Sequence, residues 1–429
     1  MIARTLQANF AIQVITFASS IMMARILGPT GRGELALVLL YPQLIANIAF
    51  MGVDRAVAVL GGRGELSRPV LTITKLVLLF SIPAIIIGYV TVNWRVTNPH
   101  LSKLSIIYLI YVPAMQFFLL VVSLFNGVGD FLRFNLTRLA FYVFNLILIM
   151  GISLSSIKIL PVLDLVLLGN LAAVYGVMFF SVWMLRSFIG SVKKEAIKKT
   201  TVSETHSVLR LAVVFALPMT LAQFSNSAYQ ITLEHFMGVK ALGLFVILLT
   251  YSRLLSPVGS AIGSHVFHVG ISGGNRDIAR IFRLSMVIYS FGIVPLWILA
   301  GWLIPIIFGR DFVVDSGTVG VLLVSTLFGQ LADNMSEYMN GQQKVKIDII
   351  SRILYLSTFA MLGYWMLSRY GLPGMAMLMV IAELMRCVYF VKSLILETKK
   401  PISEFVLVTW YDIGFLYHKG IESLLKIIK

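Results

Sequence analysis

Polar side chains recur at helical spacing inside stretches of this sequence that are otherwise apolar. Asn9, Gln13, Thr16 and Ser20 are separated by four, three and four residues, so a helix would carry them on one face. Polar groups are costly in lipid and usually face a bundle interior or a watery cavity. The stripe therefore predicts a cavity wall, and hydrogen bonding that merely holds helices together is the alternative.

Two further stripes have the same character. One comprises Gln223, Asn226, Gln230 and Glu234; the other comprises Gln330, Asp333 or Asn334, and Glu337. For the cavity wall we select the amides Gln13, Gln223, Asn226, Gln230, Gln116 and Gln330. The last two are related by the internal repeat described below. A single Gln or Ser favours helix packing, whereas stripes on repeat-related helices favour a cavity.

Charged residues within the apolar stretches indicate what such a cavity could bind. Arg253 falls near the middle of an apolar stretch, where it needs water, a carboxylate or an anionic ligand. Arg55 is a second cavity candidate, although it and Asp54 can also pair with neighbours and reach the interface. Asp333 and Glu337 lie one helical turn apart. With Asp54 they are candidates for coupling to a cation or proton, and a structural pair with Arg253 or another basic group is the alternative.

Glu383 and Arg386, three residues apart, are expected to form an ordinary ion pair on one helix. A cavity with fixed cations suits an anionic substrate, because the planar donors of arginine match phosphate.

The elements that must position these residues are membrane-spanning helices. The 429 residues are 58% hydrophobic and only 13% charged, and the apolar residues form long runs. A run of about 20 apolar residues crosses a bilayer as a helix, because lipid cannot satisfy free backbone groups. We predict an all-α polytopic membrane protein with about twelve spans. They cover 6–26, 35–60, 70–92, 104–126, 135–155, 161–185, 208–233, 241–264, 284–308, 317–340, 347–368 and 371–393.

The distribution of cations predicts the orientation. With the N-terminus in the cytoplasm, eight of the 35 Lys and Arg fall on the outer side, Arg55 and Arg253 within spans, and 25 on the inner side. Cytoplasmic loops carry an excess of Lys and Arg. Both termini are therefore expected inside, in a multi-pass protein of the cytoplasmic membrane.

The two halves of the chain repeat. Residues 33–41 resemble residues 243–251 at an offset of 210, and residues 126–138 align with residues 340–352 at an offset of 214. Both halves start on the same side, so they are parallel repeats around a central cavity. We predict a six-helix lobe at 1–185, a basic linker at 186–207, a second six-helix lobe at 208–393 and a cytoplasmic or interfacial tail at 394–429.

Several functional classes are disfavoured. We find no HExxH pair, GxSxG elbow or Walker A sequence, so neither an enzyme nor an ATPase is expected. One cysteine, Cys387, permits no internal disulfide and no cysteine-based metal site. The formal charge of +16 is scattered through short loops, which argues against nucleic-acid binding. No cofactor or metal is predicted.

The segment 24–36 between the first two spans resembles the loop that marks bacterial polysaccharide flippases of the multidrug/oligosaccharidyl-lipid/polysaccharide exporter superfamily. It reads Ala-Arg-Ile-Leu-Gly-Pro-Thr-Gly-Arg-Gly-Glu-Leu-Ala. The Asn-Gly segments at 126–127 and 340–341 are similar to that family too, as are the length and the two halves. Carried over, the loop residues are Arg25, Gly28, Pro29 and Gly33, with structural roles expected.

The resemblance implies a flippase that moves undecaprenyl-pyrophosphate-linked oligosaccharide from the inner to the outer leaflet. Such proteins work by alternating access, driven by an ion gradient, in O-antigen lipopolysaccharide, capsule or exopolysaccharide biosynthesis. The implied partners are the lipid-linked substrate, an H⁺ or Na⁺ gradient, membrane lipids and other assembly proteins. The alternatives are an ion-coupled multidrug or metabolite exporter of the same superfamily, a membrane glycan polymerase or ligase, and a non-catalytic component of a glycan-assembly complex.

Overall fold

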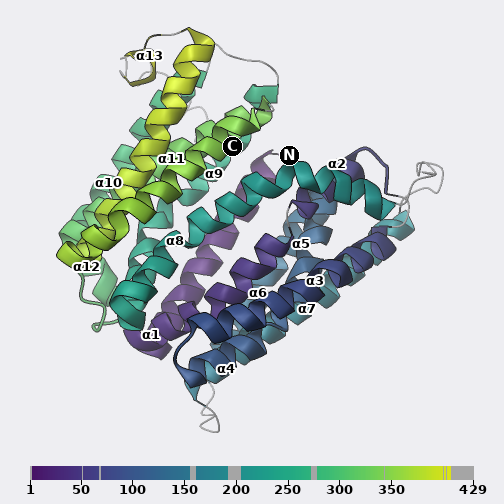
Figure 1. Ribbon diagram of the computed structural model, residues 1–429, viewed down its shortest axis with the longest axis horizontal. Helices are drawn as coiled ribbons and strands as arrows, with labels where there is room; N and C mark the ends of the chain where they lie inside the picture. Colours follow the sequence, from purple (N-terminus) through teal and green to yellow (C-terminus); the bar gives the residue numbers. More distant parts are fainter. Residues whose placement is uncertain are drawn as a thin grey trace, which may run out of the picture. The chain divides into compact units, whose positions relative to one another are not determined.

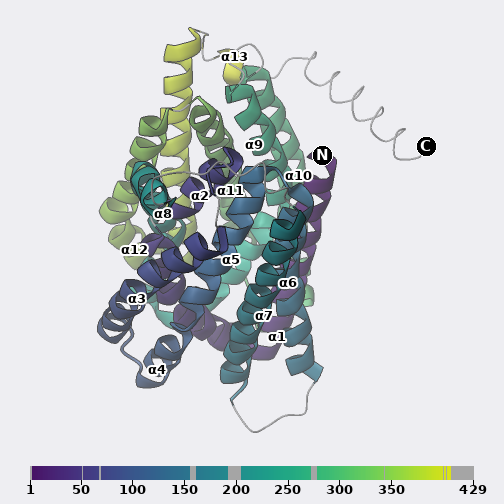
Figure 2. The same cartoon turned by 90° about the vertical axis from the view of Figure 1, so that its right-hand side faces the viewer.

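The computed structural model is all-helical over the residues that it describes, which are 2–50, 52–66, 69–154, 161–191, 204–271, 278–342, 344–399, 401 and 403–406. Figures 1 and 2 show the helices from two directions. Their bounds are α1 Ile2–Ala49, α2 Val53–Gly62, α3 Pro69–Arg95, α4 Pro99–Tyr108, α5 Tyr111–Val128, α6 Phe131–Leu154, α7 Val162–Ser191, α8 Glu204–Ser252, the 3₁₀ turn η2 Arg253–Leu255, α9 Ser256–Ile271, α10 Ile278–Phe308, α11 Ser316–Gly341, α12 Val345–Thr398 and α13 Ser403–Val406. Most of the predicted linker and tail, at 192–203 and 407–429, lies outside the described residues.

The helices match the predicted membrane spans. Eight apolar segments in the described residues are long enough to cross a membrane, and three of them are 43, 57 and 53 residues long. A single crossing needs about 20 residues, so each of these three contains two spans. With α11, which carries the third polar stripe, they account for the twelve predicted spans. The predicted fold class is therefore confirmed.

The first two of these long helices break at equivalent glycines. Gly28 in α1 has φ 66° and ψ −177°, and Gly238 in α8 has φ 76° and ψ −176°. The two positions differ by the repeat offset of 210, so one backbone device occurs in both halves. A left-handed φ favours glycine because it has no Cβ. Pro29 follows Gly28 and begins the next helical segment, where its missing N–H costs nothing.

This geometry corrects the expected loop between the first two spans. Residues 24–36 are helical except at Gly28. The structural role predicted for these residues has a physical basis here. Arg25 donates from Nε to the carbonyl of Ile307 at 2.9 Å, and so ties the helix to the end of α10.

Gly33 and Gly243 make a reciprocal contact between α1 and α8. A Cβ on Gly33 would lie 1.8 Å from the carbonyl oxygen of Val239, and a Cβ on Gly243 would lie 1.9 Å from that of Pro29. Both pairs are related by the offset of 210. The backbones therefore touch about a local two-fold relation, and a close approach of this kind needs residues without side chains.

The chain packs as two compact units. Unit 1 comprises Met1–Ile247 with Ile307–Phe312, and unit 2 comprises Leu248–Ile306 with Val313–Lys429. The units follow packing, whereas the predicted lobes at 1–185 and 208–393 follow the sequence repeat, so α8 up to Ile247 groups with unit 1. The lobes remain a prediction.

Each unit has its own apolar core. In unit 1 the buried residues Val57, Leu76 and Phe125 join α2, α3 and α5. In unit 2 the buried residues Phe282 and Phe390 join α10 and α12, with α11 packed between α9 and α12 (Figure 1). Large apolar side chains such as those of Phe291, Ile298 and Trp302 on α10 remain exposed, as expected for a helix that faces lipid.

Candidate functional site

The amide stripe of α8 lies in unit 1 and meets α1. Gln223 accepts a hydrogen bond through Oε1 from Nδ2 of Asn47 at 3.3 Å. Gln230 donates from Nε2 to the hydroxyl of Tyr229 at 2.8 Å. Asn226 is exposed. Two of the three predicted cavity residues on α8 are thus tied to neighbours, and Asn226 is the one whose amide faces open space.

The residues of the stripe on α1 also differ from one another in their surroundings. Thr16 donates to the carbonyl of Ile12 within its own helix. Asn9 accepts a hydrogen bond from Arg138 on α6 at 3.1 Å. Gln13 is half-buried and has an interaction partner, and Ser20 is buried. Part of this stripe therefore faces another polar helix, which the sequence analysis did not identify.

Gln116 and Gln330 hold helices together in both halves. Gln116 is fully buried, accepts from the hydroxyl of Ser81 at 2.7 Å and donates to the carbonyl of Ala46. Gln330 accepts from the hydroxyl of Tyr289 at 3.3 Å. It packs so closely on Gly259 that a Cβ there would lie 1.7 Å from its Oε1. These contacts are those of the packing alternative, so neither amide belongs to the site that we propose.

Arg55 and Asp54 follow the helix break at Gly52, whose φ is 76°. Arg55 is exposed and Asp54 is half-buried. Neither makes an ion pair within the part of the chain that the structure describes. The alternative, that these residues pair with neighbours, is therefore not seen among the described residues, and the Arg55 guanidinium remains available to an anion.

Unit 2 contains a buried charge network centred on Arg386. The Arg386 side chain is 2% exposed, with Nη1 2.7 Å from Oε2 of Glu383 and Nη2 2.9 Å from Oδ1 of Asp333. Arg352 places Nη2 3.6 Å from the same Asp333 oxygen and Nε 3.5 Å from Oδ1 of Asp348. The expected pair of Glu383 and Arg386 is present, but it is one edge of a network that joins α11 to α12.

Asp333 is the accessible member of this network. Its side chain is 49% exposed, against 13% for Glu383 and 8% for Asp348. Arg253 interacts with it electrostatically. Arg253 is itself exposed and lies in η2, where the eighth predicted span breaks. Non-helical backbone within a membrane is tolerated only where it is buried in protein or lines a water-filled cavity.

The charge network contains as many carboxylates as guanidinium groups. The carboxylates are those of Asp348, Glu383 and Asp333, and the guanidinium groups are those of Arg352, Arg386 and Arg253. The first two carboxylates are buried against their arginines, so Asp333 and Arg253 are the exposed members. Glu337, one turn from Asp333, is half-buried and has an interaction partner. The arrangement can bind a proton or a cation at Asp333 and an anion at Arg253, with each event affecting the other.

The structure also shows cations that sequence reasoning missed. Arg138 on α6 lies within a predicted span and is half-buried, as is Arg32 on α1, which lies just after the break at Gly28. The buried Nε of Arg32 has no hydrogen-bond partner among the described residues. The repeat contained a signal for Arg138, because the offset of 214 pairs it with Arg352. Counting arginines by loop side had assigned Arg138, Arg352 and Arg386 to the inner surface.

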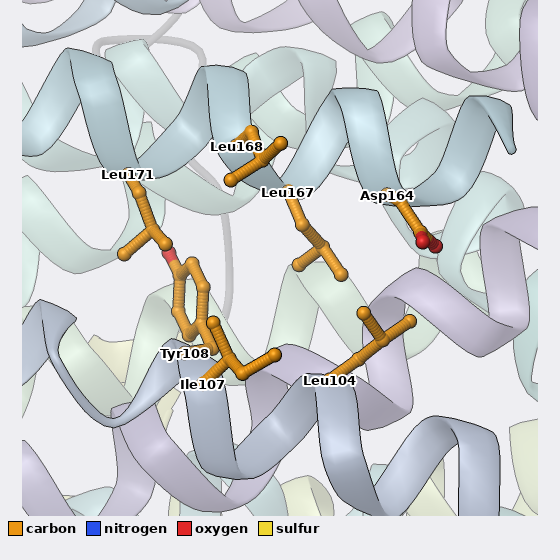
Figure 3. A pocket seen from close by; sticks show the side chains of 7 residues that line it. All are labelled: Leu104, Ile107, Tyr108, Asp164, Leu167, Leu168 and Leu171. Carbon is orange, nitrogen blue, oxygen red and sulfur yellow. The ribbon is translucent and has the colours of Figure 1, made fainter. Parts of the chain in front are cut away.

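A small cavity lies between α4 and α7, away from these residues (Figure 3). Its volume is about 150 Å³, room for about five waters at their liquid volume. Its lining is apolar apart from Tyr108 and Asp164. An oligosaccharide would not fit, and we do not place the functional site there.

Comparison with known proteins relates the fold to membrane transporters. A lipid II flippase, MurJ, in an inward closed conformation matches with a TM-score of 0.71 and 14% identity, over 97% of this chain and 92% of that chain. An inward-facing MATE multidrug resistance transporter of the MOP superfamily matches with a TM-score of 0.67 and 15% identity, over 90% and 94%. A MOP superfamily transporter from Pyrococcus furiosus, described as having a binding pocket of reversed polarity, matches with a TM-score of 0.64 and 16% identity, over 93% and 96%.

No protein-family model matches the chain, and no curated protein matches it in sequence. The structural neighbours therefore establish the fold that this chain shares with transporters and a flippase.

Proposed function

We propose that this protein is a flippase that moves an undecaprenyl-pyrophosphate-linked oligosaccharide from the inner to the outer leaflet of a bacterial cytoplasmic membrane, for surface polysaccharide synthesis. The observation that carries the proposal is the exposed Arg253 guanidinium at a helix break within an apolar span, on a fold shared with a lipid flippase. An arginine in this position suits a pyrophosphate, because its planar donors bind phosphate oxygens in pairs. The lipid tail would remain in the bilayer.

The balance of charge favours an anionic substrate over a cationic drug. Asp333 is the exposed carboxylate of the network, and two arginines already contact its Oδ1. A bulky organic cation must displace these guanidinium groups to reach the carboxylate, whereas a proton or a small metal ion can bind its exposed side without displacing them. Arg55 and Arg138, in contrast, have no carboxylate partner among the described residues.

We assign coupling to Asp333. A proton or Na⁺ that binds its exposed side chain would cancel the negative charge facing Arg253. Arg253 would then hold a substrate anion more tightly, and release of the ion would weaken that hold. Asp333→Asn should abolish the dependence of transport on the ion gradient. Unchanged gradient dependence in that variant would remove Asp333 from the coupling mechanism.

The proposed activity is tested first by deleting the gene and measuring lipid-linked oligosaccharide at the inner leaflet, together with surface polysaccharide. A flippase defect accumulates the lipid-linked unit and removes the surface glycan, and the wild-type gene restores both. A polymerase defect would instead leave single units at the surface. Normal levels of both, in a strain with no second flippase, would contradict the proposal.

Arg253→Ala should lower transport by about tenfold or more, the cost of one charge-assisted contact to phosphate, at an unchanged amount of membrane protein. Arg369→Ala is the matched control, because Arg369 is an exposed arginine of the same unit outside the charge network. If Arg253→Ala fails to accumulate while Arg369→Ala does, Arg253 is structural and the site assignment is wrong.

An ion-coupled multidrug exporter is the second candidate. The similarity in fold to a MATE multidrug transporter supports it. In that case Asp333 would bind the drug, Asp333→Asn would abolish resistance to toxic cations, and deleting the gene would leave the surface glycan unchanged.

A further inference from the structure

The sixth helix carries a polar stripe of its own. Asn135, Arg138, Tyr142 and Asn145 are separated by three, four and three residues on α6, which places them on one face. The opposite face carries the exposed apolar side chains of Leu132, Leu136 and Ile147. The apolar face is the one suited to lipid, so the polar face is directed towards protein. In unit 1, α6 packs against α1 and α7, and Figure 2 shows the three helices side by side.

Arg138 is the cation of this stripe, and its contacts are weak ones for a guanidinium. Nη1 donates to Oδ1 of Asn9 on α1 at 3.1 Å. The guanidinium carbon lies 4.9 Å from the centre of the Phe134 ring, and Tyr142 interacts with it electrostatically. No carboxylate among the described residues pairs with Arg138. A half-buried cation in a spanning helix normally pairs with an anion, so this one has capacity for a ligand.

The repeat supplies an internal control for this observation. Arg352 is the equivalent residue at the offset of 214, and it has Asp348 and Asp333 within 3.6 Å. Phe134 occupies the position equivalent to Asp348. The same arginine is therefore neutralised by carboxylates in unit 2 and left with an amide and an aromatic ring in unit 1.

A second polar residue on this face has an atom without a hydrogen-bond partner among the described residues. Oδ1 of Asn145 is buried and makes no hydrogen bond within the described part of the chain. A buried polar atom without a partner costs free energy unless a water or a ligand satisfies it. Asn145 lies two helical turns from Arg138, so groups that can hydrogen-bond to a ligand extend along this face of α6.

The position of Arg138 along α6 fits a ligand that enters from one leaflet. Arg138 is seven residues from the start of α6, or about 10 Å along the helix axis. Asn9 lies equally near the start of α1. In the proposed orientation, with the N-terminus in the cytoplasm, both helices start at the inner surface. Arg138 would then lie just below the lipid headgroups of the inner leaflet.

We propose that Arg138 and Asn9 form a binding subsite for the phosphate of a lipid anion, used when the lipid-linked substrate enters from the inner leaflet. This inference rests on the proposed function for the identity of its ligand. Arg138 supplies the charge, Asn9 orients the guanidinium between α1 and α6, and Tyr142 provides a further polar group at the same face.

The sharpest test is Asn9→Asp. This nearly isosteric change places a carboxylate where Arg138 already donates, and reproduces in unit 1 the pairing that Arg352 has in unit 2. If Arg138 binds phosphate, the new carboxylate competes, and affinity for undecaprenyl pyrophosphate should fall about tenfold, as for loss of one charge-assisted contact. If Arg138 only ties α1 to α6, Asn9→Asp should strengthen the tie and leave affinity unchanged, which would overturn the proposal.

Three further variants test whether the loss of affinity is specific to Arg138. Arg138→Gln should match Asn9→Asp in affinity, and Arg138→Lys should retain part of the binding. Arg133→Gln is the matched control, because it removes the same charge from the same helix where the arginine is already paired with Asp130. Binding is measured on full-length purified protein, with the thermal unfolding midpoint recorded for each variant. Equal losses in Arg133→Gln and Arg138→Gln would show a general charge effect and overturn the subsite.

The source of the phosphate is distinguished by competition. Undecaprenyl pyrophosphate binding should resist vesicles of phosphatidylglycerol as well as vesicles of phosphatidylcholine. Displacement by phosphatidylglycerol alone would identify Arg138 as a site for bulk anionic lipid and contradict the role in substrate entry. A deletion strain that accumulates lipid-linked oligosaccharide, combined with normal flipping by Asn9→Asp, would leave the proposed function intact and remove only this inference.

Discussion

Arg138 and Arg352 are the same residue of the repeat in two different surroundings. Arg352 is 13% exposed, faces Asp348 and Asp333, and belongs to a network that links α11 to α12. Arg138 faces Asn9 and Phe134 and has no carboxylate partner in the described residues. The contrast shows that the two halves keep the same helix breaks and cations but differ in the counter-charges. A largely buried arginine that contacts two carboxylates is structural, whereas Arg138, which contacts none among the described residues, is available to a ligand.

The backbone devices are the part that the halves share, and breaking them should have the largest effect. Gly33→Ala and Gly243→Ala each place a methyl group within 2 Å of a carbonyl oxygen across the α1–α8 contact. The helices would have to separate, at a cost of about 3 kcal/mol or more. We expect both variants to lose membrane accumulation to a similar extent, as measured by quantitative immunoblotting of membranes.

Gly151→Ala is the control for that pair. A Cβ there would meet nothing within 4 Å, so this variant should accumulate normally. If Gly33→Ala and Gly243→Ala lost accumulation to different extents, the two sides of the contact would contribute unequally to stability, although their geometry is the same.

Asp348→Asn sharpens the comparison between the arginines. The change gives Arg352 an amide partner like that of Arg138, while Ser336, which now donates to Asp348 at 2.7 Å, can still donate to the new carbonyl oxygen. Because Asp333 remains near Arg352, we expect a loss of about 1–3 kcal/mol rather than the full cost of an unpaired buried charge. The thermal midpoint of the purified protein should fall. An unchanged midpoint would mean that the unit 2 network is not structural.

The smallest effect concerns helix caps. The carboxylate of exposed Asp315 caps α11 by accepting from the backbone N–H of Thr318 at 2.9 Å. In unit 1 the amide of Asn98 caps α4 by accepting from the backbone N–H groups of His100 and Leu101. The backbone N–H groups of Thr318 and Gly317 lower the pKa of Asp315. A lowered folded-state pKa stabilises the fold above the unfolded value, and the stabilisation is lost as pH falls through the folded value.

Asp315→Ala should therefore lower the thermal midpoint slightly near neutral pH and leave it unchanged at a pH below the folded-state pKa. Asp315→Asn should retain most of the cap, because asparagine is an equally good capping residue. A deficit of Asp315→Ala that persists unchanged at the lowest pH would contradict the role of the carboxylate charge.

Much of the fold was predictable from the sequence because membrane spans are local features. A helix in lipid satisfies its own backbone, so length and hydropathy are enough to place it. The loop expected around Gly28 was wrong because one glycine with a left-handed φ can redirect a chain without ending its helical pattern.

The surroundings of the polar residues were less predictable from the sequence than the membrane spans. Their spacing showed which positions share a face, but not which neighbour that face meets. Gln116 and Gln330 were selected for a cavity wall, but Gln116 is buried, Gln330 is half-buried, and both hydrogen-bond to neighbouring helices. Glu383 and Arg386 were identified as a pair from their interval alone, yet Asp333 reaches the pair from α11 and the interval contains no sign of it.

The sequence by itself determined that this chain crosses a membrane many times, that its halves repeat, and that cations and amides lie within its spans. Only the tertiary structure decided which cations are neutralised. A helix brings residues three or four apart onto one face through its own hydrogen bonds. Whether Arg352 meets Asp333, or Arg138 meets Asn9, depends on how separate helices pack, and in the second case that packing joins residues 129 positions apart.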